Sequence, residues 1–415
     1  MTESIDTFAL AKGFRATATA CGLKTSGAMA ASSLDMALVA ADGPCSAAGV
    51  FTTNKVKAAP VRYDQYVLAS GAGAIRAVVV NAGNANACTG PQGDENCRRM
   101  AELTAYGLRC APEQVLVLST GVIGRQLDMA KVSQGIATLT SPAAEKGAPF
   151  AARAIMTTDS RPKVASATID VGGRTVTIAG FCKGAGMIHP NMATMLAVIT
   201  TDARVDTALL DQALRAAANK SFNRISVDGD TSTNDTVLLL ASGASEADIT
   251  PDTYPTFLAA LTEVCQRLAK QVARDGEGAT RLVEILVTGA RDEAEAHQVA
   301  NSIATSPLVK TAVHGGDPNW GRVLCAAGYS GADIDPDRLS LTFGPADHHG
   351  DNDTPAVEVV RGGLPVEADL RQAAATLKAD PVHIRLDLGQ GEAQSTVWTC
   401  DLSAEYVAVN AHYTT

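Results

Sequence analysis

The chain has 415 residues and a net charge of −10, with 46% hydrophobic and 19% charged residues. This composition excludes a disordered or fibrous protein, because such chains lack the apolar residues that a packed core needs. The acidic pI near 5.2 argues against nucleic acid or an anionic membrane as the main partner. No run of about 18 apolar residues occurs, so we expect no membrane-spanning segment.

The cysteines and the N-terminal residues bear on the cellular compartment. The nine cysteines are scattered and include no CxxC pair, so reduced thiols in a cytosolic protein are expected. The chain does not begin with a basic segment followed by an apolar one, and we therefore expect no signal peptide and a cytoplasmic location. The seven histidines include no HxxxH pattern, so a metal site is not expected.

Up to about residue 290, strands and helices are predicted to alternate. Apolar runs predict strands at 77–80, 115–118, 195–199 and 236–240. Alternating residues predict a hairpin over 166–179 that turns at Gly172 and Gly173. Helical spacing, with Asp94 and Asp206 as N-caps for the first two, predicts helices over 95–109, after 206 and over 256–274.

Beyond residue 290, strands dominate. One more helix is predicted over 293–305. Apolar and β-branched runs then predict strands at 339–343, 357–360, 384–388 and 395–401, with a turn at 389–392 joining the last pair. The chain should therefore hold a large α+β domain over 1–290 and a smaller α+β domain over 291–415.

The most unusual stretch is KGAGMIHPNMATML, residues 183–196. Gly184 and Gly186 make its start flexible, Pro190 restricts the backbone, and Thr194 stands ahead of an apolar run. A hydroxyl held at the start of a strand after such a loop suits a nucleophile. On spacing alone, the simpler interpretation is a glycine-rich turn before a buried strand.

Two further stretches carry polar groups next to glycines. In STGVIG (119–124) the Thr120 hydroxyl and the N–H groups around Gly121 could stabilise an oxyanion, although an ordinary strand-to-loop turn explains the same pattern. In RDGEGATR (274–281), two acids and two arginines alternate with glycines. This segment could recognise a charged amino acid, or it could simply be a solvated helix end.

The run ISVDGDT (225–231) fits the nucleophile signature of haloacid-dehalogenase-type phosphatases, with Asp228 as nucleophile and Asp230 as acid/base. Those enzymes also need a downstream acidic pair. The nearest candidate, residues 316–322, has Asp317 but no second acid. We therefore interpret the run as a structural polar turn and keep an aspartyl phosphatase as an alternative.

Taken together, these segments resemble one family, the ornithine acetyltransferases of arginine biosynthesis, also called glutamate N-acetyltransferases or ArgJ. Residues 183–196 match the family's autocleavage motif. The other matching blocks, in the same order as in the family, are GVFTTNK (49–55), STGVIG (119–124), MTTD (156–159), SVDGDTSTND (226–235), DGEGATR (275–281) and YVAVNAHYTT (406–415).

The resemblance implies that the precursor cleaves itself between Ala193 and Thr194. The Thr194 hydroxyl would attack the Ala193 carbonyl, and water would open the resulting ester. The freed α-amino group, with a reference pKa of about 7.7–8.0, could then act as a base for its own hydroxyl. In a ping-pong reaction, Thr194 would carry acetyl from N2-acetylornithine to glutamate, giving ornithine and N-acetylglutamate.

The resemblance also implies roles for other residues. Thr120 and Gly121 match the oxyanion-hole pair. The positions that match substrate contacts are Thr157, Lys183, Thr194, Glu277, Asn410 and Thr415. No metal and no cofactor are implied, although a bifunctional member would also accept acetyl-CoA as an acetyl donor.

The implied fold is an α/β/β/α sandwich of the ornithine acetyltransferase/DmpA type, similar to N-terminal-nucleophile hydrolases, followed by a smaller C-terminal α+β domain whose tail returns to the active site. An α chain (1–193) and a β chain starting at 194 would associate into an α2β2 heterotetramer. Two other classes stay open: an N-terminal-nucleophile amidohydrolase that uses water as acceptor, and a non-catalytic binding protein.

Overall fold

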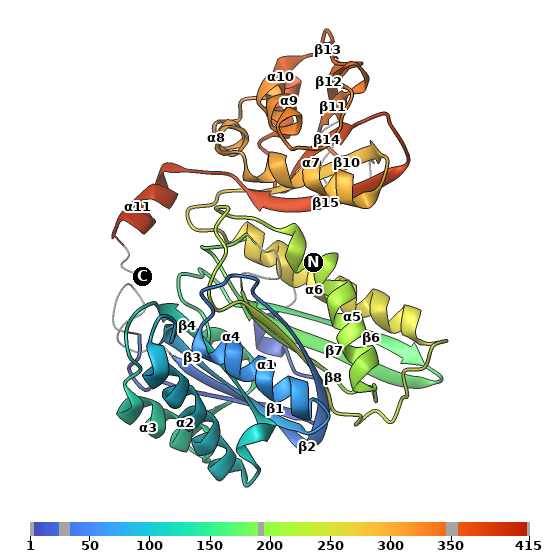
Figure 1. Cartoon of the computed structure of the whole chain (residues 1–415). Helices are drawn as coiled ribbons and strands as arrows, with labels where there is room; N and C mark the ends of the chain where they lie inside the picture. The colour runs from blue at the N-terminus through green and yellow to red at the C-terminus, as the bar shows by residue number, and fades with distance from the viewer. Residues whose placement is uncertain (1–3, 25–33, 190–194, 346–355, 413–415) are drawn as a thin grey trace. The chain divides into compact units, whose positions relative to one another are not determined.

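The computed structural model describes residues 4–24, 34–189, 195–345 and 356–412. They form two compact units (Figure 1): the first unit is built from residues up to Asn223 and from Thr231–Val272, and the second unit from Arg224–Asp230 and Ala273–His412. This division differs from the border predicted at residue 290, because strand β10 (Leu282–Ala290) pairs with two strands near the C-terminus and belongs to the second unit.

The described part of the first unit holds one nine-stranded sheet. Its strands are β1 (Phe14–Thr19), β2 (Met36–Phe51), β3 (Ile75–Asn84), β4 (Val115–Val122), β5 (Glu145–Lys146), β6 (Lys163–Val171), β7 (Arg174–Lys183), β8 (Leu196–Thr201) and β9 (Thr236–Ala241). Its helices are α1 (Ala59–Gly71), α2 (Gly90–Leu108), α3 (Met129–Leu139), α4 (Ala148–Ala154), α5 (Thr207–Asn219) and α6 (Tyr254–Arg274), whose last two residues are in the second unit.

Seven strands of this sheet form the path β4-β3-β2-β9-β8-β7-β6, and β1 joins β5 to β2 beside it. The long strand β2 divides this path into two layers. Its first half pairs with β3 and its second half with β9, and the register shifts between Ala40 and Cys45. Inward-facing residues of β2–β4 and of β7–β9 share one core, with Val78 and Leu116 from one layer and Phe181 and Leu238 from the other. Helices α1–α3 cover the outer face of the first layer, and α5 and α6 cover the second (Figure 1). The predicted α+β class and the α/β/β/α sandwich are thus confirmed.

Two of the predicted local features, a helix cap and a hairpin turn, are confirmed. Asp206 caps α5, since its side chain accepts a hydrogen bond from the Ala208 N–H at 2.9 Å. Gly172 and Gly173 turn the β6–β7 hairpin with φ of 61° and 80°. Asp94 was wrong as a cap: α2 begins at Gly90, five residues earlier than predicted, because a proline in its first turn starts the helix there.

The described part of the second unit contains one six-stranded sheet, and several helices pack against it. Its strands are β10, β11 (Ser340–Phe343), β12 (Val357–Arg361), β13 (Leu364–Pro365), β14 (Val382–Asp387) and β15 (Ala393–Cys400), in the order β13-β12-β11-β14-β10-β15. Its helices are α7 (Glu293–Thr305), α8 (Pro307–Gly315), α9 (Trp320–Gly328), α10 (Leu370–Thr376) and α11 (Ala404–His412). The predicted turn at 389–392 does connect β14 to β15, but these strands lie on either side of β10 and do not pair with each other.

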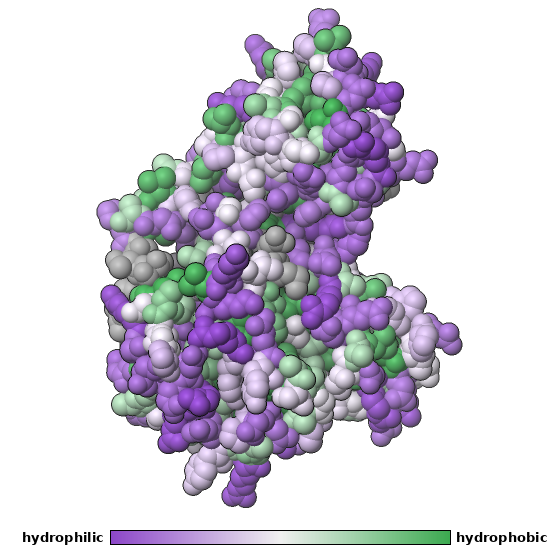
Figure 2. All heavy atoms as spheres, in the orientation of Figure 1, coloured by the Kyte–Doolittle hydropathy of each residue, from purple (hydrophilic) through white to green (hydrophobic). Residues whose placement is uncertain are grey.

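The exposed residues are mostly hydrophilic on one face of the molecule. On the face that Figure 2 shows, hydrophilic residues cover most of both units and hydrophobic residues lie in small separate patches. In the part of the chain that the structure describes, no helix combines the length and the apolar character needed to cross a membrane.

Candidate active site

Thr120 and Gly121 lie at the end of β4, next to the end of the parallel strand β3. The register places Gly121 opposite Gly83. Gly121 has φ 131°, and a Cβ atom there would come within 2.3 Å of the Gly83 carbonyl carbon. Only glycine permits this close approach of the two backbones. The local structure therefore explains why the STGVIG segment has a glycine directly after Thr120.

Lys183, the last residue of β7, contacts Thr120. Its Nζ donates a hydrogen bond to Thr120 Oγ1 across 3.4 Å. A lysine ammonium has no acceptor, so the threonine oxygen must be the acceptor in this contact. The hydroxyl proton of Thr120 can therefore point to another oxygen. The structure thus brings together two residues that the sequence predicted for different roles.

A small pocket surrounds this contact. The described residues that line it come from β4, β7, the start of β8 and the segment before β9, and they are Thr120, Lys183, Gly186, Met195, Leu196, Ser232, Asn234 and Asp235. Met195 directly follows Thr194 in the chain. Ala193 and Thr194 themselves lie outside the described residues, so the pocket is defined by the residues on either side of the predicted cleavage position.

Asn234 holds the segment before β9 in place. Its side-chain amide donates to the Ala85 carbonyl at 2.6 Å and to the Ser119 carbonyl at 2.8 Å. The side chain is buried, and both acceptors belong to the chain just after β3 or inside β4. The segment before β9 is therefore tied to the same strand ends that carry Thr120.

Thr157 is joined to the Lys183 segment by Asp159, a residue for which the sequence suggested no role. The Asp159 carboxylate accepts the Thr157 N–H at 3.0 Å and the Gly184 N–H at 2.6 Å. It also accepts a hydrogen bond from the Lys163 ammonium at 2.6 Å, and both side chains of this ion pair are fully buried. Asp159 therefore orients the backbone next to two of the predicted substrate contacts.

The charge state of Asp159 follows from these neighbours. Burial acts to raise the pKa of the Asp159 carboxyl, but the Lys163 and Lys183 ammonium groups and the donated hydrogen bonds outweigh it. The pKa lies well below its usual range, so the group is a carboxylate at any physiological pH.

Lys24 is a second residue that the sequence gave no reason to select. Its side chain is buried and donates to the Ala154 carbonyl at 3.0 Å. Burial lowers the pKa of Lys24 to about 8, although the negative charges of Asp35 and Asp159 act in the opposite direction. A buried amine that titrates near neutral pH therefore lies within electrostatic range of Asp159 and Lys183.

Glu277 and Asn410 meet in the second unit. Asn410 Nδ2 donates to Glu277 Oε2 at 2.8 Å, although the two residues are 133 positions apart in the chain. Tyr406, one turn before Asn410, has a raised pKa because of burial and of the nearby Asp228, Glu277 and Asp230 carboxylates. The tyrosine is therefore a neutral phenol in an acidic environment, and Thr415, the last predicted contact, lies outside the described residues.

The Asp228/Asp230 run is a turn rather than the end of a strand. Asp228 Oδ1 accepts the Asp230 N–H at 3.2 Å, and Gly229 has φ 84°. The interpretation as a structural polar turn agrees with this geometry. Within the described ranges, no group of three or more His, Cys, Asp and Glu side chains is arranged to hold a metal ion.

The fold and the pocket define a class: four-layer α/β/β/α proteins with a polar pocket at the strand ends and a second α+β unit. The ArgJ family model matches residues 15–415, and the chain therefore belongs to the ArgJ family. This membership argues against the aspartyl phosphatase alternative.

Similar proteins cover nearly the whole chain. The proteins of Symbiobacterium thermophilum and Synechocystis, both called arginine biosynthesis bifunctional protein ArgJ, are 49% and 47% identical to this chain. Each alignment covers 97% of this chain and 97% of the relative. Among solved structures, Bacillus halodurans ArgJ is 44% identical, covering 52% of this chain and 97% of its own, with a TM-score of 0.48. Mycobacterium tuberculosis ornithine acetyltransferase with ornithine is 41% identical, covering 44% of this chain and 94% of its own, with a TM-score of 0.37.

Proposed function

We propose that the chain is a self-cleaving acetyltransferase of arginine biosynthesis, which transfers acetyl from N2-acetylornithine to glutamate. Membership in a family whose curated members are named for arginine biosynthesis is one support. The observation that carries the proposal is the pocket in which Thr120 and Lys183 lie beside Met195, the residue after the proposed nucleophile Thr194.

The first step is cleavage between Ala193 and Thr194. The Thr194 hydroxyl adds to the Ala193 carbonyl, the peptide C–N bond breaks, and the acyl group moves to oxygen as an ester. Water then hydrolyses the ester and leaves a 193-residue chain and a chain of 415 − 193 = 222 residues. The new α-amino group has an ordinary pKa near neutrality, about 7.7–8.0, and can deprotonate the hydroxyl of the same residue.

The second step is acyl transfer to the enzyme. The Thr194 oxygen attacks the acetyl carbonyl of N2-acetylornithine, its α-amino group takes the hydroxyl proton, and the ornithine amine leaves with a proton. The Gly121 N–H and the Thr120 hydroxyl would stabilise the tetrahedral oxyanion. Thr120 suits this role because its contact with Lys183 uses only the oxygen as acceptor. One such donor contributes about 3–4 kcal/mol to the transition state.

Two charged side chains are proposed substrate contacts. Lys183 is a partner for the substrate α-carboxylate, next to the Thr157 segment that Asp159 orients. Glu277, whose carboxylate retains acceptor capacity beyond the Asn410 amide, is a partner for the ornithine ammonium. Glu277 would repel the glutamate side chain, so a water, a proton or a shifted pose must separate the two carboxylates.

In the third step the glutamate amine attacks acetyl-Thr194, giving N-acetylglutamate and the free enzyme. The similar proteins are named bifunctional. We therefore extend the proposal to acetyl-CoA as an additional acetyl donor, without any bound cofactor. An assay with acetyl-CoA and glutamate, but no N2-acetylornithine, tests this extension. We further propose a cytoplasmic α2β2 assembly of the two fragments.

Replacing Thr194 tests the proposal directly. Thr194→Ala removes the hydroxyl on which both cleavage and transfer depend, so intact mass under denaturing conditions should give one full-length chain, with no acetyl transfer. Thr194→Ser should keep part of both activities, because hydroxyl and amine remain. Thr168→Ala, an exposed position on β6, is the matched control and should cleave normally. Two fragments from Thr194→Ala would contradict the assignment.

The amidohydrolase alternative differs only in the acceptor. With N2-acetylornithine alone, a transferase should release about one equivalent of ornithine per active site and then slow until glutamate is added. Sustained ornithine release without glutamate would instead identify water as the acceptor.

A further inference from the structure

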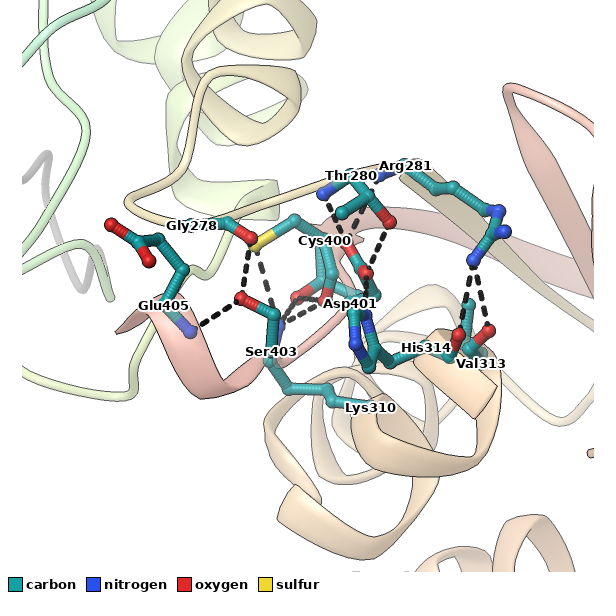
Figure 3. Close-up of polar contacts among 11 residues, drawn as sticks. Gly278, Thr280, Arg281, Lys310, Val313, His314, Cys400, Asp401, Ser403 and Glu405 are labelled. Carbon is teal, nitrogen blue, oxygen red and sulfur yellow. Dashed lines mark hydrogen bonds and ion pairs between the residues drawn. The ribbon is translucent and has the colours of Figure 1, made fainter. Parts of the chain in front are cut away.

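The junction between β15 and α11 is bound to the loop that carries Glu277 (Figure 3). Asp401, at this junction, is 2% exposed. Its Oδ1 accepts the backbone N–H groups of Thr280 at 2.7 Å and of Arg281 at 3.0 Å. Its Oδ2 accepts the Thr280 hydroxyl at 2.6 Å and lies 2.7 Å from His314 Nδ1. One buried carboxylate therefore connects the loop, helix α8 and the C-terminal segment.

Ser403 provides a second connection between the same segments. Its hydroxyl donates to the Gly278 carbonyl at 2.6 Å and accepts the Glu405 N–H, at the start of α11, at 3.2 Å. Gly278 has φ 70°, and a Cβ atom there would come within 2.5 Å of the Tyr406 backbone nitrogen. The backbone of the Glu277 loop is therefore in close contact with the first turn of α11.

Lys310 anchors the junction from α8. Its buried Nζ donates to Thr399 Oγ1 at 2.8 Å and to the Cys400 carbonyl. Its own carbonyl accepts the Leu402 N–H at 3.3 Å. The residues just before α11 are thus bound on both sides before the helix begins, as Figure 3 shows.

Helix α11 needs such support. It has nine residues and none of them is buried. A helix this short is marginal in water by itself, and its apolar side chains are at most partly buried. Its direction, and with it the position of Asn410 relative to Glu277, must therefore come mainly from the junction.

We propose that Asp401 is a positioning residue: by joining the 277–281 loop to the start of α11, it sets the distance between Glu277 and Asn410 and so the affinity for the amine-bearing substrate. The last part rests on the proposed function, in which Glu277 and Asn410 contact substrate. The hydrogen bonds of Asp401 lie within the second unit, and it acts only through the segments it holds.

Asp401→Asn is the most direct test. Asparagine keeps one acceptor for the two N–H groups but turns a donor toward the Thr280 hydroxyl and His314. Hydrogen exchange in α11 and in residues 277–281 should accelerate by about tenfold, the expected size of losing one charge-assisted hydrogen bond. KM for N2-acetylornithine should rise by about tenfold or more while kcat and self-cleavage change little. Ser403→Ala is a milder second variant, and Glu358→Gln, in an exposed ion pair of the same unit, is the control.

The outcomes separate the two proposals. Unchanged exchange in Asp401→Asn and Ser403→Ala would overturn the positioning role, whatever the activity. Faster exchange, together with an additive loss of affinity when Asp401→Asn is combined with Glu277→Gln, would also overturn it, because a residue that acts through Glu277 should add little once Glu277 is changed. If Glu277→Gln alone leaves KM unchanged while exchange accelerates as expected, the substrate role of Glu277 fails and the connection through Asp401 stands.

Discussion

Each unit of the molecule contains a buried carboxylate that holds a loop with predicted substrate contacts, but the two carboxylates are neutralised differently. Asp159 in the first unit accepts two backbone N–H groups and forms a fully buried ion pair with Lys163. Asp401 in the second unit also accepts two backbone N–H groups, but its other partners are a hydroxyl and the half-exposed His314.

The difference shows in the pKa values. Both carboxyl groups have lowered pKa values although burial opposes the shift, but two ammonium groups lower that of Asp159, whereas a hydroxyl, His314 and two backbone N–H groups lower that of Asp401. Removing an ion-paired carboxylate leaves a buried cation without a partner, whereas removing a carboxylate that binds neutral donors leaves only unsatisfied hydrogen bonds. The first unit should therefore be the more fragile of the two toward loss of its carboxylate.

Asp159→Asn should have the largest effect. It removes the carboxylate from the fully buried ion pair with Lys163, so the free energy of unfolding should fall by about 3–5 kcal/mol, measured by urea denaturation of the cleaved protein. The control is Asp211→Asn, which breaks an ion pair of the same i,i+4 spacing but on the exposed face of α5 and should cost under about 1 kcal/mol. Equal losses in the two variants would remove the distinction between the two kinds of carboxylate.

The effect of Asp159→Asn on stability should depend on pH. The folded-state pKa of Asp159 is below the unfolded value of about 3.9, so the folded state binds fewer protons between those two values. Its contribution to stability is complete above about pH 4 and is lost as the pH falls through the folded pKa. Asp159→Asn should therefore lose stability uniformly at neutral pH, and the difference from the parent protein should shrink in acid.

Gly121→Ala should have the next largest effect, and mainly on activity. The added Cβ meets backbone atoms of β3 rather than a side chain that can move away, so Thr120 and the Gly121 N–H must shift. Loss of one oxyanion donor lowers kcat by about 10²–10³-fold. Gly124→Ala, which also has positive φ but meets nothing within 4 Å, isolates the backbone strain and should keep most activity. Equal kcat values in both variants would contradict an oxyanion role at Gly121.

Much of this architecture could be predicted from the sequence because local signals and burial agree. The apolar runs of β3, β4 and β9 are buried on both faces, and the pair Gly172–Gly173 turns a hairpin where the pattern predicted one. The match of family blocks predicted Thr120, Lys183, Glu277 and Asn410, and the structure joins these four into two contacting pairs. The role of Thr194 stays a prediction.

The sequence could not predict the residues that act through burial. Asp159 has no distinctive spacing from Gly184, and its importance follows from the tertiary contact between their segments. The same holds for Asp401, whose partners lie 87 and more positions away in the chain. The sequence shows which side chains are carboxylates. A carboxylate holds two segments together only when packing excludes water from its hydrogen bonds, and packing is a property of the folded chain.

A third buried carboxylate, Asp64 on α1, shows what Asp159 would be without its ammonium partner. Asp64 is fully buried, Oδ1 accepts the Val117 N–H at 2.8 Å, and Oδ2 has no hydrogen-bond partner among the described residues. Burial raises its pKa well above the ordinary value. The folded state therefore binds more protons than the unfolded state above about pH 3.9, and the contribution of Asp64 to stability is lost as pH rises through the folded pKa.

Asp64→Asn, the smallest effect of the three, tests that contrast with Asp159. The amide resembles the protonated acid in shape and can still accept the Val117 N–H. The free energy of unfolding of the variant should match that of the parent near pH 4 and exceed it by about 1 kcal/mol or more at pH 8, since a buried polar group without a hydrogen-bond partner costs about 1–3 kcal/mol. Urea denaturation at both pH values measures this difference. A loss of stability at pH 8 would mean that Asp64, like Asp159, is ionised in the folded protein. A buried carboxylate would then be stable in this fold without a neighbouring cation.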